Sequence, residues 1–272
     1  MHFLTTLIFA TTIGLGASAV PLKFTPDNFT LTTSSSASPS NGIPTTSLRP
    51  TSVSQTVSSS ARAVVSSAPS RAVSESTGMT PSQVTKALAS FGGPCAPSPN
   101  NTCRTADQIA TAVNQSFRRF GLDTVGEQAA VFALMAFESG GFQFDVNVFP
   151  GRPGQGTRNM MMFDFVLPYA LEFNPSAVRA IRSDLVLGRA TAADVPDDQQ
   201  RNLIRATVLG DELSFASGAW FLREKCKPDI ALGLQSATAD AWNRYMDPEC
   251  VGAGQDPARL ALYQAALEAM GA

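Results

Sequence analysis

The chain has 272 residues and a formal net charge of −2, from 20 Lys and Arg against 22 Asp and Glu. This near-neutral balance gives no electrostatic case for nucleic acid or an anionic membrane as partner, and we expect neither. The only histidine is His2, at the extreme N-terminus. Once it is removed with a leader, histidine-based triads, histidine-ligated zinc and histidine acid–base catalysis are excluded. Carboxylates are then the main catalytic groups.

The first 19 residues form a short apolar run that ends in Ala17-Ser18-Ala19. Small residues at the first and third positions of such a triplet are typical of a signal-peptidase site. The run is shorter than a usual membrane anchor. We therefore expect a signal peptide over residues 1–19 and a protein that is secreted, extracellular or associated with a cell wall.

Residues 20–78 are dominated by Ser, Thr and Pro and contain few aromatic residues. Such a composition cannot bury enough apolar surface to offset chain entropy, and it predicts a disordered, O-glycosylated stalk. N-glycosylation triplets begin at Asn28, Asn100 and Asn114, although the pattern is common by chance. The folded domain is expected over residues 79–272, a length sufficient for one core.

The sequence of this domain predicts helices almost throughout. Thr80-Pro81 is an N-cap followed by a first-turn proline, and it predicts a helix toward Phe91. Thr105 and Gln108 have the spacing of a capping box and open a second helix. Further helices are predicted over 124–138, 160–173, 175–187 and 212–223, with others opening at Pro196 and Asp256. We expect little β-structure, with one small hairpin after Phe142.

Four cysteines in an exported chain indicate disulfides before they indicate a metal site. Cys95 and Cys103 bracket a turn-rich segment, and Cys226 and Cys250 bracket a helical one. Of the three possible pairings we favour these two local ones. No metal and no cofactor is expected.

The central feature is the segment 124–159, an apolar helix that ends on a carboxylate and opens into a glycine-rich loop. Thr124 can cap the helix, and Glu127 can complete a capping box. Residues 129–137 are all apolar, which predicts a buried helix. Glu138 would face apolar neighbours and the negative end of the helix dipole. Both disfavour its charged form, as a general acid requires, but an exposed Glu at a helix end fits the spacing equally well.

These motifs resemble the active-site region of the lysozyme-like superfamily. Lytic transglycosylases and goose-type lysozymes have a Glu-Ser at such a helix end, followed by a glycine-rich loop. Plant-type chitinases have His-Glu-Ser/Thr-Gly-Gly-Phe and then Gly-Arg-Gly…Gln-x-Thr…Asn-Tyr. This chain shares F-E-S-G-G-F at 137–142 and G-R-P-G-Q-G-T-R-N at 151–159, with shifted spacing. Phe137 stands where the chitinases have histidine, and their second acid has no obvious counterpart here. The resemblance covers residues 129–165 well and the rest loosely.

The resemblance implies a mainly α, lysozyme-like helical domain with a buried central helix. It also implies a secreted enzyme, a glycoside hydrolase or lytic transglycosylase, that cleaves an N-acetylglucosamine-containing cell-wall polymer, either peptidoglycan or chitin/chitosan. Glu138 would be the general acid and Asp145 its helper, although Asp145 could equally be a turn residue. The candidate substrate-binding residues are Ser139, Gln155, Arg158, Asn159 and Tyr169. Arg158 could instead pair with an aspartate, and Tyr169 could belong to the core.

Two other interpretations stay open. The missing histidine and second acid also fit a lysozyme-like domain that binds a glycan or a host partner without turnover, such as an effector. A purely structural helical protein would instead have Glu138 exposed or salt-bridged, with no cleft beside it. For the first two, the expected partner is a polysaccharide, and the protein is expected to be a monomer.

Overall fold

The computed structural model describes residues 78–97 and 102–272. The predicted signal peptide and nearly all of the predicted stalk lie outside the described residues, as do Asn28 and Asn100 of the glycosylation triplets. The described residues all belong to one compact unit. Within them, no helix combines the length and the apolar character needed to cross a membrane.

The described residues form ten α-helices and two short 3-10 turns, which confirms the mainly α class. The α-helices are α1 (Pro81–Ala87), α2 (Ala106–Phe120), α3 (Val125–Glu138), α4 (Phe163–Phe173), α5 (Pro175–Ile181), α6 (Asp198–Ala206), α7 (Asp211–Glu224), α8 (Pro228–Leu234), α9 (Ala239–Met246) and α10 (Pro257–Met270). Strand pairing in this part of the chain is limited to isolated bridges from Gly156 to Val146 and to Met161. The predicted hairpin after Phe142 is therefore wrong.

The helix starts follow the local capping signals in two of three cases. Thr105 forms a reciprocal capping box with Gln108, as predicted. The predicted cap at Thr80 is also confirmed, and it proves to be a reciprocal capping box with Gln83. Thr124 caps α3 by accepting the backbone N–H of Glu127, but Glu127 does not return a bond to the backbone. Its carboxylate accepts the Thr124 hydroxyl at 2.8 Å and pairs with Arg223 of α7 at 3.1 Å. The predicted cap is confirmed. The predicted capping box is wrong, because the Glu127 carboxylate pairs with Arg223, which is distant in the sequence.

Two predicted helix lengths are also wrong. α5 ends at Ile181 instead of continuing to residue 187, and its C-cap Arg182 turns back to Asp184 at 2.7 Å. α6 begins at Asp198, because the Asp197 side chain accepts the N–H of Gln200 and so caps the helix after the proline. At the start of α6, this short-range cap overrides the longer amphipathic pattern.

Helix α3 is buried along almost its whole length, as its apolar sequence predicts. Every residue from Val125 to Ala136 is buried. Gly126 permits a close approach of α8, since a Cβ there would lie 1.9 Å from the Leu234 carbonyl oxygen. Gly218 of α7 packs against Met135, with a Cβ there at 2.8 Å from the sulfur. Neighbouring helices can therefore pack closely around α3.

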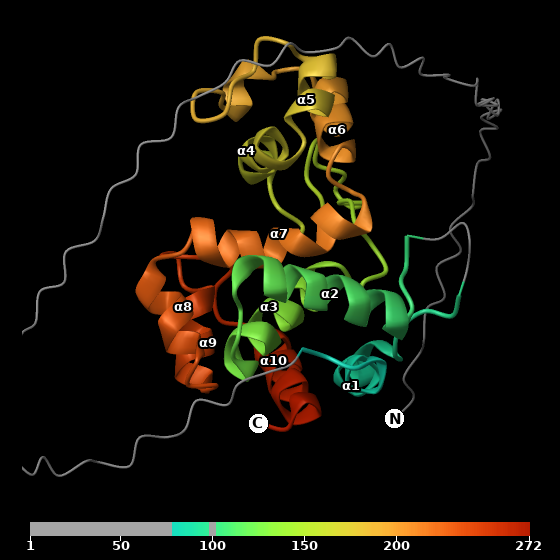
Figure 1. The fold of residues 1–272 in the computed structure, drawn as a ribbon, viewed down its shortest axis with the longest axis vertical. Helices are drawn as coiled ribbons and strands as arrows, with labels where there is room; N and C mark the ends of the chain where they lie inside the picture. The colour runs from blue at the N-terminus through green and yellow to red at the C-terminus, as the bar shows by residue number, and fades with distance from the viewer. Residues whose placement is uncertain (1–77, 98–101) are drawn as a thin grey trace, which may run out of the picture. The chain divides into compact units, whose positions relative to one another are not determined.

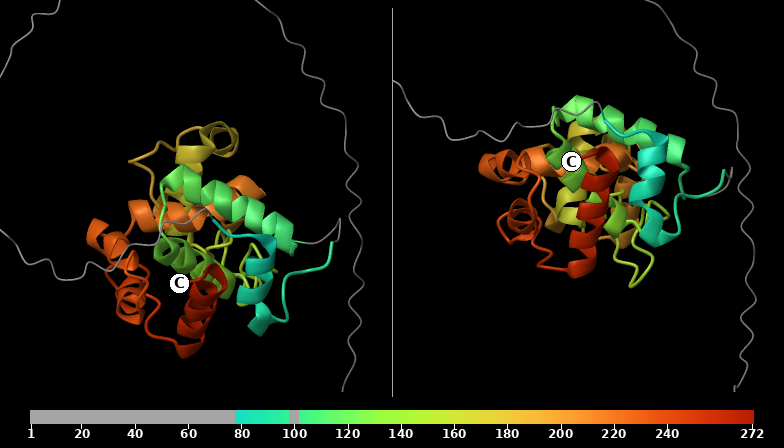
Figure 2. Two further views of the ribbon diagram at one scale, coloured as in Figure 1. Left: turned by 60° about the horizontal axis from the view of Figure 1, so that its bottom comes forward. Right: turned by 90° about the horizontal axis from the view of Figure 1, so that it is seen from below.

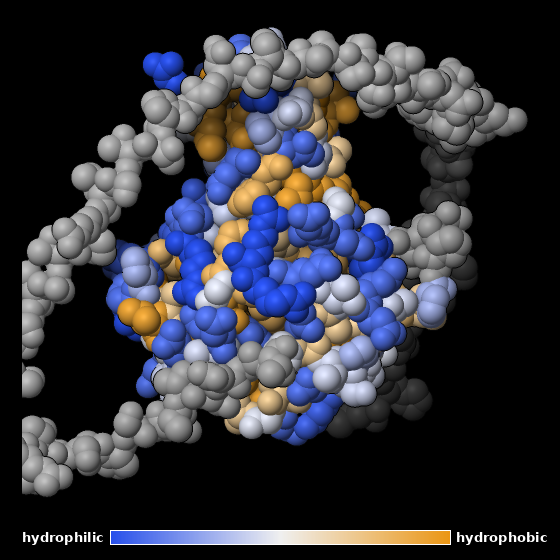
Figure 3. Space-filling view, viewed as in Figure 1, coloured by the Kyte–Doolittle hydropathy of each residue, from blue (hydrophilic) through white to orange (hydrophobic). Residues whose placement is uncertain are grey.

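The helices form two groups on either side of α7. In Figure 1, α4, α5 and α6 lie above α7, and α1, α2, α3, α8, α9 and α10 lie below it. The three upper helices contact one another. Two further views show α10 between α1 on one side and the α8–α9 pair on the other (Figure 2). The face over α2 and α7 is largely hydrophilic, whereas apolar side chains gather around the upper group (Figure 3).

Both predicted local disulfides, Cys95–Cys103 and Cys226–Cys250, are confirmed. The second closes the segment that contains α8 and α9, and on the chain-entropy model such a loop contributes about 3 kcal/mol to stability. All four cysteines are thereby oxidised, which leaves no thiol for nucleophilic chemistry.

The glycosylation triplet at Asn114 lies inside α2 and does not present a free acceptor. The Asn114 side chain donates to the Met79 carbonyl and accepts the Met79 N–H, both at 2.8 Å. Ser116, the third residue of the triplet, is 2% exposed. The interpretation of this triplet as a glycosylation site is wrong, because the Asn114 amide is hydrogen-bonded to the Met79 backbone.

Candidate functional site

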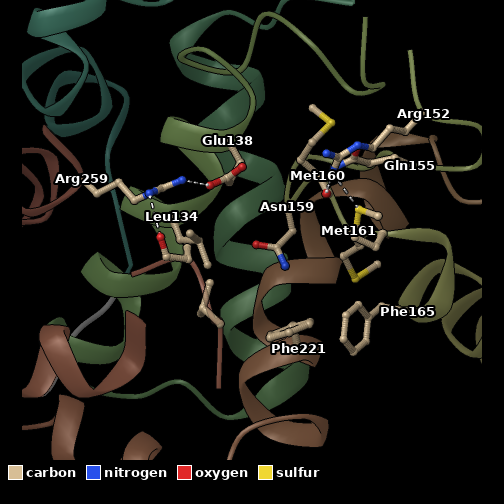
Figure 4. Close-up of a pocket in the computed structure, with 13 residues that line it drawn as sticks. Leu134, Glu138, Arg152, Gln155, Asn159, Met160, Met161, Phe165, Phe221 and Arg259 are labelled. Atoms are coloured by element: carbon tan, nitrogen blue, oxygen red, sulfur yellow. Dashed lines mark hydrogen bonds and ion pairs between the residues drawn. The ribbon is translucent and has the colours of Figure 1, made fainter. Parts of the chain in front are cut away.

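A cavity of about 310 Å³ lies where α3, α4, α7 and α10 meet the loop 151–162 (Figure 4). One part of its lining is apolar, from Leu134, Met160, Met161, Met162, Phe165, Phe221, Val251 and Ala253. The other part is polar, from Glu138, Arg152, Gln155, Asn159 and Arg259. A cavity that combines apolar side chains with a few convergent polar groups is the usual form of a small-molecule site.

Glu138 ends α3 at the edge of this cavity, where it is ion-paired. Its carboxylate accepts a bond from Arg259 Nη2 at 3.0 Å, and its side chain is 26% exposed. The Arg259 guanidinium also lies over the Phe137 ring, 4.4 Å from the centroid, and reaches Asp256 at 3.7 Å. The expected apolar isolation of Glu138 is therefore wrong, because α10 brings a cation to the end of α3.

Gln155 and Asn159 line the cavity, as the sequence predicts, and both are largely buried, at 9% and 8% exposure. Gln155 Nε2 donates to the Met160 carbonyl at 3.0 Å, which fixes the orientation of that amide. Gln155 Oε1, Asn159 Oδ1 and Arg259 Nε are buried and have no hydrogen-bond partner. Such groups are uncommon in native proteins, and each costs free energy unless a ligand or water satisfies it.

The loop that carries these amides has an unusual backbone. Thr157 and Met160 have φ values of 70° and 46°, in the left-handed region that L-residues rarely adopt. The Thr157 hydroxyl accepts a bond from Ser217 of α7 at 2.9 Å, which holds the loop against that helix. Gly154 has a φ of 76°, and a Cβ there would lie 2.4 Å from the Phe163 ring. Strained residues of this kind cluster at functional sites.

Arg158 has a structural role instead of the predicted substrate contact. It is fully buried and does not line the cavity. Its guanidinium donates to the carbonyl oxygens of Phe142 at 2.9 Å and Phe144 at 3.0 Å, and also to that of Thr102. Burial lowers the pKa of Arg158 to about 10, while the nearby Asp145 carboxylate acts in the opposite direction. The arginine thus joins its own loop to two other backbone segments, the one around residues 142–144 and the one at Thr102.

Asp145, Ser139 and Tyr169 also lie outside the cavity lining. Asp145 is 7% exposed and lies near Arg158 as a buried counter-charge, so its predicted role as catalytic helper is wrong. Ser139 is buried and donates to the Met135 carbonyl at 2.6 Å, which caps α3. The buried Tyr169 hydroxyl donates to the Leu213 carbonyl at 2.6 Å, and burial raises its pKa. Both are held by the fold, and their predicted substrate contacts are wrong.

The sequence analysis missed Arg259 and most of the apolar lining. Arg259 stands in the first turn of α10, and it is 121 residues from Glu138 along the chain. The available signals were a run of three methionines after the loop and an arginine at the start of an apolar helix. Neither pattern is specific, because both also occur in ordinary packing.

The described residues do not supply a metal-binding set. They contain no group of three or more His, Cys, Asp or Glu placed to hold an ion. The cysteines are all in disulfides, and the single histidine of the sequence, His2, lies outside the described residues. The cavity therefore offers hydrogen-bond donors and acceptors, one ion pair and an apolar surface.

Comparison with known proteins gives one informative similarity. No family model matches the chain, and no solved structure matches it. The chain is similar to a bifunctional dioxygenase (DOX)-epoxy alcohol synthase (EAS) of Fusarium oxysporum (strain Fo5176), at 38% identity over 166 residues. The match covers 60% of this chain and 12% of the relative. It therefore relates this chain to a small part of a much longer protein.

This similarity contradicts the expectation of a glycoside-cleaving enzyme. The relative's name describes oxidative chemistry and epoxy alcohol formation, with no hydrolase activity. The expected hydrolase or lytic activity on a cell-wall polymer is therefore wrong, as is the expected role of Glu138 as acid for a glycosidic oxygen. Secretion, a polysaccharide partner and a monomeric state stay predictions.

Proposed function

We propose that the described domain binds a small organic molecule that combines an apolar chain with a hydroxyl or epoxide oxygen. The observation that carries this proposal is a cavity lined both by apolar side chains and by Gln155, Asn159 and Arg259, each of which has a buried polar atom without a partner in the protein. The domain acts in this proposal as a binding module and not as the site of the reaction.

The apolar lining fits a flexible hydrocarbon chain. Met160, Met161 and Met162 line the cavity together with Phe165 and Phe221. Met160 and Met161 lie next to each other in Figure 4, and the two phenylalanine rings form another part of the lining. Methionine side chains are unbranched and polarizable, so they adapt to ligands of irregular shape. Burial of a chain against this surface would be driven by the hydrophobic effect.

The polar side of the cavity fits a hydroxyl or epoxide oxygen. A hydroxyl can donate to an amide oxygen of Gln155 or Asn159 and accept from Arg259 Nε, so it can satisfy both kinds of unpartnered atom. An epoxide oxygen can accept from the arginine or from the Asn159 amide nitrogen. The Glu138–Arg259 ion pair, at 3.0 Å, keeps the guanidinium in place at this end of the cavity.

The relative's name supports the same class of molecule, because it states that the relative forms an epoxy alcohol. Dioxygenase chemistry requires a redox centre, and the donor set of the described residues does not fit one. We therefore assign no oxidative step to this domain. Most of the relative lies outside the match, so its reaction does not have to reside in the matched part.

We also infer a lysozyme-like arrangement of the helices. Its support is the buried α3, which ends on Glu138 beside a cavity, and the glycine-rich loop 151–162 that lines the same cavity. In this view the domain keeps the frame of that superfamily and uses its cleft for binding. Superposition of an experimental structure on lysozyme-like domains would test this inference, and a different helix order around α3 would refute it.

Calorimetric titration of the full chain tests the proposed function. The ligands are a long-chain epoxy alcohol, the corresponding alcohol, the corresponding hydrocarbon and a chitin oligosaccharide. We expect saturable binding of the first two, with an affinity for the hydrocarbon that is lower by about tenfold, the value of one lost hydrogen bond in a dry site. Binding of the oligosaccharide alone would instead support a polysaccharide partner.

Two variants place the binding in the cavity. Asn159→Leu removes the amide at nearly constant volume and should lower affinity for the epoxy alcohol by about tenfold. Met162→Ser alters an apolar residue that is 39% exposed and should leave folding intact while weakening all the chain-bearing ligands. The matched control is Asn243→Leu on α9, a half-buried asparagine that does not line the cavity. Equal affinities for all four proteins would refute the proposal.

A further inference from the structure

A protruding apolar tip lies on the segment that leads into the cavity loop. Phe144, Val148 and Phe149 are 46%, 68% and 91% exposed, and we call these three residues the apolar tip. The other exposed large apolar residues of the described part are the pair Val186 and Leu187, at 52% and 48%, and the single residues Met162, Leu203 and Leu232. The tip therefore holds the most exposed aromatic residue described.

The segment that carries the tip is held in a closed turn. The Asn147 side chain accepts the N–H groups of Gly151 at 2.8 Å and Arg152 at 3.1 Å. The Asn147 N–H donates to the Gln155 carbonyl at 3.3 Å, next to the bridge between Val146 and Gly156. Because these bonds fix the turn on both sides, Val148 and Phe149 stay at its outer end. An aromatic side chain held in water in this way costs free energy unless it serves an interaction.

A cation lies beside the tip. Arg152 is exposed, forms no ion pair with the described residues and contacts Met162 Sδ at 3.6 Å. Arg152 and Met162 both line the cavity. The Arg152 backbone also bonds to Asn147 in the turn that carries Val148 and Phe149, so this arginine links the cavity lining to the apolar tip. Apolar side chains flanked by an arginine are the combination that binds a lipid surface, where the former enter the acyl region and the latter meets phosphate groups.

The size of the tip favours a lipid surface over a folded protein. A stable protein interface buries about 800 Å² on each partner, which three exposed side chains cannot provide. A bilayer needs no complementary shape, and it accepts a few protruding side chains. It is also the phase in which an apolar ligand of the cavity would be concentrated.

We propose that the apolar tip docks the domain on a lipid surface and places the cavity mouth against it, so that an apolar ligand enters from the lipid. This docking goes beyond the proposed function, since the cavity could bind its ligand from solution without it. It also differs from the expectation of no membrane partner, which rested on net charge alone.

Vesicle flotation of the full chain tests this proposal, with vesicles of phosphatidylcholine alone and of phosphatidylcholine with phosphatidylserine. We expect the chain to float with both, more strongly with the second. The double variant Val148→Ser with Phe149→Ser should lose at least tenfold in partitioning. The double variant Val186→Ser with Leu187→Ser is the matched control, an adjacent exposed pair elsewhere, and should partition as the parent does. Arg152→Gln should weaken binding about fivefold on the anionic vesicles only.

The same proteins are titrated with the epoxy alcohol in solution. The tip variant should bind it as the parent does, so loss of vesicle binding with intact ligand binding supports docking as a separate property. Failure of the parent chain to float overturns the docking proposal, even if the ligand binds. Equal flotation of parent and tip variant also overturns it. A parent chain that self-associates through the tip, with a mass that falls to the monomer in the tip variant, would assign the tip to a protein contact instead.

Discussion

The loop 151–162 has two sides that use buried polar groups in opposite ways. Behind the cavity, Arg158 is fully buried and donates to three carbonyl oxygens, so it connects backbone segments. On the cavity side, Gln155 and Asn159 are almost as buried, yet each has an amide oxygen without a partner. Burial alone therefore does not indicate a binding role. The unfilled hydrogen-bonding capacity separates the binding side of this loop from its structural side.

The largest expected effect is on the structural side, from Arg158→Leu. The change leaves three carbonyl oxygens and the Asp145 carboxylate without the guanidinium, and we expect the free energy of unfolding to fall by about 3–5 kcal/mol. Urea unfolding followed by circular dichroism measures it. The control is Arg152→Leu, an exposed arginine of the same loop, which should change stability by no more than about 0.5 kcal/mol. Similar losses for both variants would remove the distinction between the two sides.

A second variant tests the glycine between the two sides. Gly154→Ala places a Cβ 2.4 Å from the Phe163 ring at a φ of 76°, and both effects oppose folding. We expect a loss of about 2 kcal/mol or more in the free energy of unfolding. Gly188→Ala isolates the backbone contribution, because Gly188 has a φ of 77° and no atom near the added Cβ. If the two glycine variants lose the same amount, the contact with Phe163 does not constrain the loop.

A third variant separates ligand binding from stability on the cavity side. Arg259→Leu breaks the ion pair with Glu138, whose partners are 17% and 26% exposed. Because solvent screens such a pair, we expect a stability loss of only about 1 kcal/mol. The affinity for the epoxy alcohol should fall about tenfold with the lost donor. The exposed pair Arg244–Asp229, at 2.7 Å, supplies the control Arg244→Leu, which should leave the affinity unchanged. An unchanged affinity in Arg259→Leu would mean that the Arg259 guanidinium does not bind the ligand.

The smallest and most specific effect is the change in the free energy of unfolding that we expect for Asn159→Leu. Removing an amide that has an unpartnered buried oxygen should leave the free energy of unfolding unchanged or raise it by up to about 1 kcal/mol. Asn114→Leu should instead cost about 2 kcal/mol, because Asn114 makes two bonds of 2.8 Å to the Met79 backbone. A large stability loss in Asn159→Leu would mean that its amide serves the fold and not a ligand.

The features that sequence analysis predicted correctly depend on short-range interactions. The caps at Thr80 and Thr105 lie within three residues of their partners, and the apolar run of α3 indicates burial directly. The two disulfides close loops of 8 and 24 residues, so sequence proximity favours them. These signals are sufficient for the helical class and for the placement of Glu138 at a helix end.

The features that it predicted wrongly depend on contacts between distant segments. Glu127 forms an ion pair with Arg223 and does not complete a capping box, and Glu138 forms an ion pair with Arg259, which is 121 residues away in the sequence. Arg158 and Asn159 are neighbours in one motif, but the backbone directs one into the fold and the other to the cavity. No periodicity or spacing in the sequence records such pairings. The resemblance to a glycosidase motif likewise described the local chain and did not determine the activity.

The most direct test of the central claim is a crystal structure of the full chain with a long-chain epoxy alcohol. The account predicts the ligand in the cavity of α3, α4, α7 and α10, with its chain along Met160–Met162. It further predicts a ligand oxygen within hydrogen-bond distance of the Asn159 amide and of Arg259 Nε. An empty cavity under saturating ligand, or a ligand bound elsewhere, would contradict the account.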